Sequence, residues 1–299
     1  MRDVVTHVQA CGRPAVDPAL LAALRAVEPT DPLLAAWLPC LLDHERPGFD
    51  TYAAVPVLEQ AAAAQRDPEA AFDELIAALL ADLLLVETTA LAARPTPAQR
   101  LRTLAGVRAV ARSGDLAPRA RARIPDITDT SALVATAAEL ARTVLRRTPP
   151  ALRTAVGAAV LPMTTLHDEI VVIRCAQVTE LLYRRLGARL KRAVHALRRG
   201  ELAEAVTQVD DASARLAASA VIVRLLATLP RDRFQVIREH TRGRGAAHTR
   251  AVRELTAHRA RLSPPRASGL ADALAVFDRA WRAVSSVREP EPENRSRIA

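Results

Sequence analysis

The stretch from Thr164 to Arg199 constrains the fold more than any other part of this sequence. Its apolar residues recur every three or four positions, which is the period of an amphipathic α-helix. Thr165, followed three residues later by Asp168, predicts a capping box at the start of the helix, and Gly200 predicts its end. The rest of the chain is therefore expected to pack around one long helix. Its apolar positions are Leu166, Ile170, Ile173, Leu181, Leu186, Leu190 and Val194.

Polar residues interrupt the apolar face of this predicted helix. Spacings of three and four place His167, Ile170, Arg174, Gln177 and Glu180 near one side. A polar line of this kind indicates either the lining of a cavity or a buried structural network, and the sequence leaves both open.

The composition favours an all-α fold. Half of the 299 residues are hydrophobic, only 3% are aromatic, and strand-forming residues never alternate with polar ones for long. A chain of this length can bury a sizeable core, so we expect a multi-helical bundle.

One stretch is typical of a linker: Ser113–Asp129 contains Gly114, Pro118, Pro125 and three alternating arginines. We place the main boundary there. The prediction is a helical N-terminal region over residues 1–125, a helical domain over 126–288 and a disordered tail over 289–299. The tail is assigned as disordered because it is charged and contains prolines.

The formal net charge is +9, and Lys191 is the only lysine among 42 basic residues. A bias toward Arg beside so much Ala is typical of GC-rich coding sequence. It weakens the case for nucleic-acid binding that net charge alone would make. Four arginines on one side of the long helix predict a solvated face balanced by Glu201 and Glu204, with a surface for nucleic acid or an acidic partner as the alternative. They are Arg185, Arg189, Arg192 and Arg199.

The three cysteines, Cys11, Cys40 and Cys175, are odd in number and unpatterned, which indicates reduced thiols and no disulfide framework. The first residues do not form a signal peptide, and the apolar run Leu75–Val86 is too short for a membrane span and contains Asp82. We therefore expect a cytoplasmic protein without a membrane partner. The sequence has no CxxC, no HExxH, no nucleophile elbow and no Gly-rich phosphate loop, so we assign no metal ligand.

Two of the few aromatic residues, Phe49 and Tyr52, stand three positions apart in the stretch Phe49–Gln60. They indicate either a core anchor for the following helix or an aromatic wall over a ligand pocket.

The residues from His167 to Arg184, HDEIVVIRCAQVTELLYR, resemble the signature helix of the tryptophan 2,3-dioxygenase family. That helix reads His-Asp-Glu, a mostly apolar run, a His-Gln pair and a Glu-Leu pair. A second block resembles the family's Phe-Arg-Asp-Tyr helix end, loop and following Arg, with Ile237–His240, Gly243–Thr249 and Arg253 at the matching positions. The resemblance covers about residues 163–261, and more weakly 49–60.

The resemblance implies an all-helical homo-oligomer that holds haem b and inserts both atoms of O₂ across the indole C2–C3 bond of L-tryptophan. It implies that Arg238 binds the ligand's carboxylate, for which the bidentate fork of Arg is suited. Phe49 and Tyr52 correspond to pocket aromatics. Val172 takes the place of a pocket phenylalanine, and Ala176 takes the place of the distal histidine.

The chain departs from the family at the iron ligand. No histidine follows His258, and the position that corresponds to the iron-ligating histidine falls near Pro290. We therefore assign no catalytic residue and leave the cofactor unknown. We expect a non-catalytic protein that binds an aromatic amino-acid-like carboxylate ligand or acts in assembly. The alternatives are an active haem-dependent dioxygenase and a basic helical interaction module.

The remaining positions of the resemblance are expected to be structural. These are His167, Asp168, Glu169, Gln177, Glu180 and Arg253. The first three could also be a simple charge cluster at a helix start, where the helix dipole favours acids. Arg238 could instead be an ion-pair partner of Glu180 or Glu169.

Overall fold

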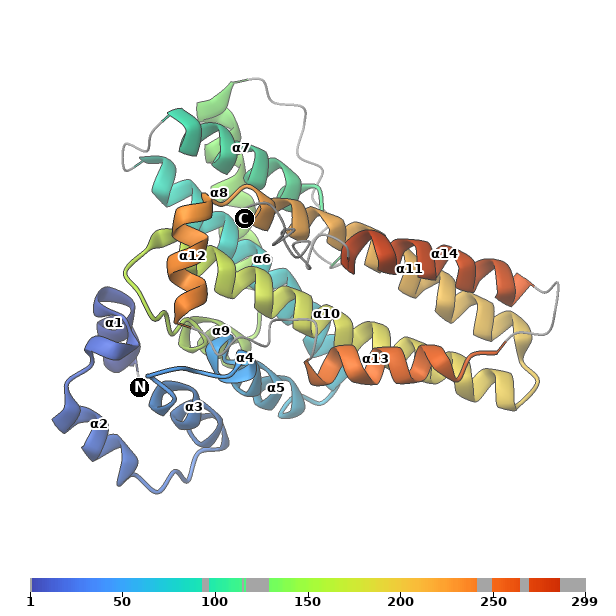
Figure 1. The fold of residues 1–299 in the computed structure, drawn as a ribbon, viewed down its shortest axis with the longest axis horizontal. Helices are drawn as coiled ribbons and strands as arrows, with labels where there is room; N and C mark the ends of the chain where they lie inside the picture. Colours follow the sequence, from blue (N-terminus) through green and yellow to red (C-terminus); the bar gives the residue numbers. More distant parts are fainter. Residues whose placement is uncertain are drawn as a thin grey trace, which may run out of the picture.

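The computed structural model describes residues 2–92, 97–114, 116, 129–240, 249–263 and 269–285 (Figure 1). These residues form helices joined by turns, and no strand occurs among them. The expectation of an all-α fold is therefore confirmed for the described part of the chain.

The helices of the first half are α1 (Arg2–Cys11), the short 3₁₀ helix η1 (Arg13–Ala15), α2 (Pro18–Arg25), α3 (Pro32–Leu42), α4 (Phe49–Tyr52), α5 (Val55–Ala63), α6 (Pro68–Ala92) and α7 (Pro97–Ala111). Those of the second half are α8 (Thr130–Arg147), α9 (Pro150–Ala158), α10 (His167–Arg198), α11 (Leu202–Ala227), α12 (Arg231–Glu239), α13 (Arg250–Ala260) and α14 (Gly269–Ser285).

Helix α10 is the central element, as the sequence predicts. It packs against α6, α11 and α13, and α11 returns along it to pack against α14 (Figure 1). The end of α10 is also as predicted, because Gly200 adopts a positive φ of 78° just after the last helical residues.

The predicted start of α10 is wrong. The helix begins at His167 with Leu166 as its N-cap, and no side chain caps it. Instead, Glu169 reaches back to the preceding turn, where its carboxylate accepts hydrogen bonds from the Met163 and Thr164 amides at 2.8 and 2.6 Å. The acid of the first turn thus satisfies amides before the helix, and the Thr164 hydroxyl accepts a hydrogen bond from the Leu166 amide at 3.1 Å and not from the first turn of α10.

One apolar core spans most of the described chain, from Val5 on α1 to Val284 on α14. Helix α6, which precedes the predicted domain boundary, packs against both α8 and α10, which follow it. The boundary itself, at residue 125, lies outside the described residues, as does the predicted tail.

No single described helix is long and apolar enough to cross a membrane. Helices α11 and α12, which meet at 98°, pass that test as a bent pair by length and composition alone.

Gly12 directly follows α1 and packs closely against the backbone of the loop before α10. It adopts a φ of 81°, and a Cβ atom at this position would lie 2.7 Å from the Met163 carbonyl oxygen. Both the backbone conformation and the space require glycine here.

We expect Gly12→Ala to lower the free energy of unfolding by about 2 kcal/mol, because alanine at this φ is strained and its methyl group collides with rigid backbone. Urea denaturation followed by circular dichroism measures this. Gly157→Ala is the control: it lies inside α9 with nothing within 4 Å of the added Cβ, so it should stabilise by about 0.5 kcal/mol. Equal effects from the two variants would contradict the assigned conformation of Gly12.

Candidate functional site

A small apolar cluster forms apart from the main core. It contains Tyr52 from α4, Met163 from the loop before α10, Ile173 from α10 and Ile237 from α12, with Leu166 and Val172 packed against it. We call these six residues the Tyr52 cluster. The segments that carry the resemblance, 49–60, 163–184 and 237–240, are far apart in the sequence and meet here.

The predicted ligand-binding residues differ in how deeply they are buried and in whether they belong to the Tyr52 cluster. Tyr52 is buried inside the cluster, and Val172 is half-buried against it. Arg238 is exposed and directly follows the buried Ile237 on α12. Phe49 and Ala176 are half-buried and are not members of the cluster.

The hydroxyl of Tyr52 is a buried polar atom without a hydrogen-bond partner among the described residues. Burial raises the pKa of this phenol well above its usual range, and the nearby Glu169 carboxylate raises it further. The phenol therefore stays protonated, as a donor.

Arg13 is a buried cation that sequence analysis missed. Its guanidinium is fully buried and donates to the carbonyl oxygens of Leu161 at 2.5 Å, Cys40 at 2.7 Å, Tyr52 at 2.9 Å and Thr51 at 3.2 Å. It also lies 5.8 Å from the centre of the Tyr52 ring. Burial lowers the pKa of Arg13.

The acceptors explain how the Arg13 charge is tolerated. The Cys40 carbonyl lies in the last turn of α3, and those of Thr51 and Tyr52 lie in the last turn of α4, where helix carbonyls lack partners and the helix dipole favours a cation. No local signal in the sequence identifies this role.

Arg174 and Gln177, on the polar line of α10, belong to a buried structural network. For these two residues the structure therefore favours a network over the lining of a cavity. The Gln177 amide donates to the carbonyls of Ala53 at 2.9 Å and Ala159 at 2.8 Å, and its oxygen accepts from Arg174 at 2.7 Å. Arg174 also binds Asp82 of α6. Gln177 thus connects the C-terminal end of α4, which carries Phe49 and Tyr52, to the central helix.

The first turn of α10 is tied to three other helices. Asp168 is almost fully buried and pairs with Arg102 of α7 at 2.7 Å and Arg233 of α12 at 3.0 Å. His167 lies 3.0 Å from Glu87 of α6. These long-range contacts support a structural role for both residues, beyond a charge cluster that serves the helix dipole alone.

Glu180 connects α10 to the start of α13. Its carboxylate accepts a hydrogen bond from the Ala251 amide at 3.4 Å. Burial raises the pKa of Glu180, and hydrogen bonds from Thr249 and Ala251 only partly oppose this. Glu169 accepts hydrogen bonds from the amides of Met163 and Thr164 and from the Thr164 hydroxyl. Arg253, the remaining predicted structural residue, is exposed on α13.

We expect Glu180→Gln to raise the free energy of unfolding at about pH 8 by roughly 1 kcal/mol, because glutamine keeps the acceptor and removes a buried charge. Since the folded-state pKa is raised, the carboxyl's own contribution is fully present below the unfolded pKa of about 4.3 and is lost as pH rises through the folded value. The advantage of the variant should therefore shrink toward pH 4.

Urea denaturation across this pH range measures the effect of Glu180→Gln. Glu201→Gln is the control, because Arg199 lowers the pKa of this exposed carboxyl and the sign reverses. A wild-type advantage for Glu180 that grows with pH would be the contrary result.

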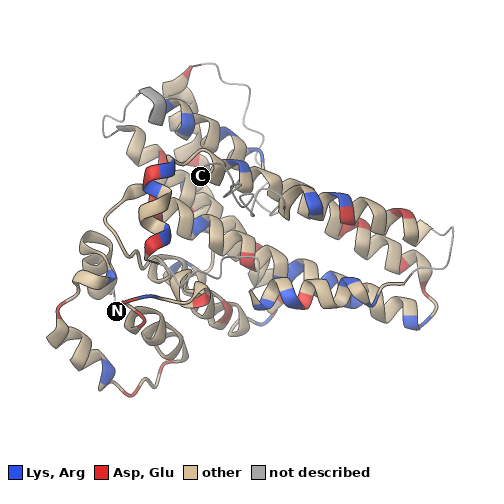
Figure 2. Cartoon of the chain, viewed as in Figure 1, with Lys and Arg blue, Asp and Glu red and all other residues tan. Residues whose placement is uncertain are grey.

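The arginines predicted to form a solvated face are mostly paired across helices, which corrects that prediction. Arg185 is buried and binds both Asp73 and Glu69 of α6, and Arg192 also binds Glu69. Arg189 binds Asp211 of α11. Only Arg199 has the predicted partner, Glu201. Arg185, Arg189 and Arg192 thus join α10 to α6 and α11. Figure 2 shows the distribution of basic and acidic residues over the helices.

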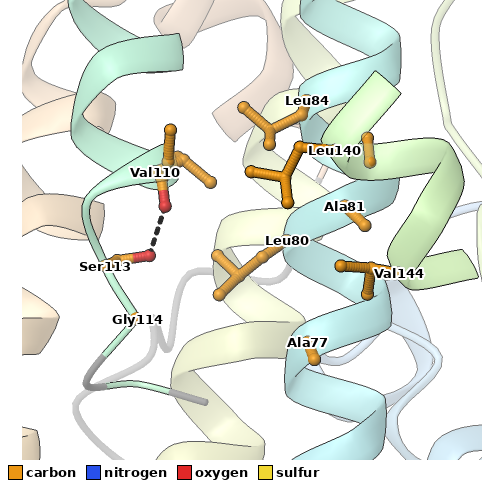
Figure 3. Close-up of a pocket in the computed structure, with 11 residues that line it drawn as sticks. Ala77, Leu80, Ala81, Leu84, Val110, Ser113, Gly114, Leu140 and Val144 are labelled. Carbon is orange, nitrogen blue, oxygen red and sulfur yellow. Dashed lines mark hydrogen bonds between the residues drawn. The ribbon is translucent and has the colours of Figure 1, made fainter. Parts of the chain in front are cut away.

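A pocket lies elsewhere, between α6, α7 and α8 (Figure 3). Its volume of about 20 Å³ is large enough for one water molecule but too small for an amino acid. It is lined mainly by apolar side chains, such as Leu80, Leu84 and Leu140, with Ser113 at its edge. It is separate from the residues that the resemblance singled out.

The described histidines do not reproduce the iron ligand that the resemblance requires. The corresponding position, near Pro290, lies outside the described residues and in any case carries no imidazole. His258 on α13 lies beside Lys191 and His195, about 30 Å along α10 from Ile173. Among the described residues no group of three or more His, Cys, Asp or Glu side chains could hold a metal ion.

The three cysteines are free thiols, of which Cys40 and Cys175 are buried. Burial raises the pKa of the Cys40 thiol to about 12 and also raises that of Cys175, so both remain protonated and unreactive.

Comparisons with protein-family models, with curated proteins and with solved structures found no match to this chain.

Proposed function

We propose that this protein is a divergent, haem-free relative of the tryptophan 2,3-dioxygenases that binds an aromatic amino-acid-like ligand through its carboxylate. The observation that carries the proposal is the Tyr52 cluster. Three sequence segments that separately resemble the family pack together there, beside the arginine that matches its carboxylate-binding residue.

Two features suit such a ligand. Arg238 is an exposed guanidinium that follows Ile237 on α12, so it can form a bidentate pair with a carboxylate, and the half-buried Leu166 and Val172 are the members of the cluster that the ring of a ligand could reach. A second feature is the buried Tyr52 hydroxyl, a donor that lies near the Glu169 carboxylate. Its environment keeps this group neutral.

The proposal does not include dioxygenase chemistry. The family's distal histidine is Ala176 here, and its iron-ligating position falls near Pro290. A neutral imidazole is what holds haem iron in that family, and neither residue can supply one. The homo-oligomeric state and the cytoplasmic location implied by the resemblance and the sequence stay predictions.

The test is a thermal-shift titration with L-tryptophan. We expect the melting temperature to rise with L-tryptophan but not with tryptamine, which lacks the carboxylate. Arg238→Ala should abolish the rise, whereas Arg231→Ala, an exposed arginine on the same helix, should keep it. A rise that survives Arg238→Ala, or an equal rise with tryptamine, would contradict the proposal.

A further inference from the structure

The arginines that face α5, α6 and α11 from α10 are neutralised by carboxylates. The pairs are Arg184 with Glu59, Arg185 with Asp73 and Glu69, Arg189 with Asp211, and Arg192 with Glu69. The cationic side chains elsewhere on α10 therefore decide whether the helix presents net charge to solvent.

Another edge of α10 carries cations that have no such partner. Lys191, His195 and Arg198 are exposed and follow one another at spacings of four and three, so they form one row on the helix surface. None of the three has a carboxylate partner among the described residues. The row covers roughly 10 Å of helix.

Helix α13 brings two more basic residues to this row. It runs beside α10 in the same direction, because Glu180 meets Ala251 and Gly187 lies against the Leu255 backbone. His258 and Arg261 consequently lie next to Lys191 and His195. Figure 2 shows basic residues along both helices. We call Lys191, His195, Arg198, His258 and Arg261 the basic patch.

The behaviour of His258 shows that the positive charge of the patch is not cancelled locally. Burial, then Arg261, Lys191 and His195, lower its pKa. The acidic group that opposes them is Glu254, which is itself paired with Arg250 at 2.7 Å. The buried Nδ1 atom of His258 has no hydrogen-bond partner among the described residues.

The chemistry of the surface favours a phosphate backbone over a protein partner. The exposed large apolar side chains of the described chain are Val27, Leu101, Leu202, Phe234, Val236 and Val276, of which Leu202 lies close in sequence to the basic patch, just after the turn that follows Arg198. Protein interfaces depend on aromatic and apolar anchors, whereas interfaces with nucleic acids are polar and strongly positive. The patch also has no aromatic ring on which an unpaired base could stack.

We propose that the basic patch binds the phosphate backbone of double-stranded nucleic acid without reading its sequence. The three fixed cations and two histidines lie on two adjacent helices. They can contact several successive phosphates, which then release their bound counterions. The sequence-based argument against nucleic acid concerned total charge, whereas this proposal depends on cations that remain unpaired on one surface.

The first test is the fluorescence anisotropy of a labelled mixed-sequence DNA duplex of about 20 base pairs. Three contacts from fixed cations should weaken binding about 20-fold between about 50 and 150 mM salt. The triple variant Lys191→Glu, Arg198→Glu, Arg261→Glu should lose at least tenfold in affinity at low salt. Lys191→Gln alone, which perturbs the exposed surface least, should lose a smaller part.

The matched control reverses three exposed arginines elsewhere, in Arg153→Glu, Arg224→Glu, Arg231→Glu, with the same change in net charge. It should keep most of the affinity. Equal losses in the two triple variants would show that total charge, and not the basic patch, binds the duplex. A poly-glutamate competitor that displaces the duplex as well as unlabelled duplex does would assign the patch to acidic polypeptides and overturn the proposal.

The second test replaces the two histidines of the basic patch. The double variant His195→Gln, His258→Gln should keep most of the affinity at about pH 7.5, because the three fixed cations Lys191, Arg198 and Arg261 make the phosphate contacts. A loss as large as that of the Lys191→Glu, Arg198→Glu, Arg261→Glu variant would contradict this assignment.

Discussion

Arg13→Met should lower the free energy of unfolding by about 4 kcal/mol, the largest effect we expect of any single substitution in this chain. The arginine is fully buried and donates to four backbone carbonyls, so its removal leaves those of Leu161, Cys40 and Tyr52 without this donor in the interior, while the Thr51 carbonyl keeps a bond from the Ala54 amide. Each unsatisfied buried polar group costs about 1–3 kcal/mol. Methionine fills most of the volume, which keeps a cavity from dominating the result.

Two opposing terms decide the size of the Arg13 effect. Methionine escapes the cost of burying a guanidinium, and this gain is several kcal/mol for a charge taken out of water. The carbonyl acceptors belong to helix ends and a fixed loop, however, so they cannot turn to find other donors. We therefore expect the loss to exceed the gain.

Urea denaturation followed by circular dichroism measures the effect of Arg13→Met. Arg13→Lys should fall between wild type and Met, because lysine keeps the charge and loses the planar fork. Arg153→Met, at an exposed position, is the control and should change stability by less than about 0.5 kcal/mol. A loss below about 1 kcal/mol in Arg13→Met would refute its role in joining the N-terminal helices to the loop before α10.

Gln177→Leu is expected to cost about 3 kcal/mol and to couple strongly to Arg174→Met. Leucine removes the donors to the Ala53 and Ala159 carbonyls and leaves the Arg174 guanidinium short of one acceptor. A hydrogen bond to a charged group is worth about 1.5–3 kcal/mol, and the buried carbonyls add their own penalty.

A double-mutant cycle on these two positions separates the network from simple packing. The Gln177 and Arg174 side chains share one hydrogen bond, so the double variant should be less damaging than the sum of the singles by at least about 1 kcal/mol. The melting temperatures and unfolding free energies of the four proteins provide the cycle. Strict additivity would mean that the polar line is not a network and would reopen the interpretation as a cavity lining.

The elements of this fold that local patterns specify could be predicted from the sequence. The pairs Asp17-Pro18 and Asp31-Pro32 begin α2 and α3, and in each case the aspartate accepts a hydrogen bond from the first turn, as capping requires. The period of the apolar residues and Gly200 specify α10 and its end.

The partners of the polar residues could not be predicted, because they come from distant parts of the chain. Arg102 and Arg233 meet at Asp168 across 66 and 65 positions, and Arg13 reaches Leu161 across 148. Nothing in the spacing of these residues indicates such contacts. The same limit explains the error on the arginine face of α10, since its carboxylates lie on α6 and α11.

The candidate ligand site contains residues that could be predicted from the sequence and residues that could not. The resemblance singled out Tyr52 and Val172, which both belong to the cluster, whereas the sequence did not indicate that Ile237, Met163 and Leu166 would pack with them. Apolar residues that join such a cluster look like any other core residue in a sequence.

The central claim is that this chain keeps a ligand-binding helical scaffold without haem. It is tested most directly by the absorption spectrum of the purified protein after expression with haem supplied. We predict a colourless protein without a Soret band, since no imidazole occupies the position that the resemblance assigns to the iron ligand. A Soret band at stoichiometric occupancy, together with turnover of L-tryptophan, would contradict it.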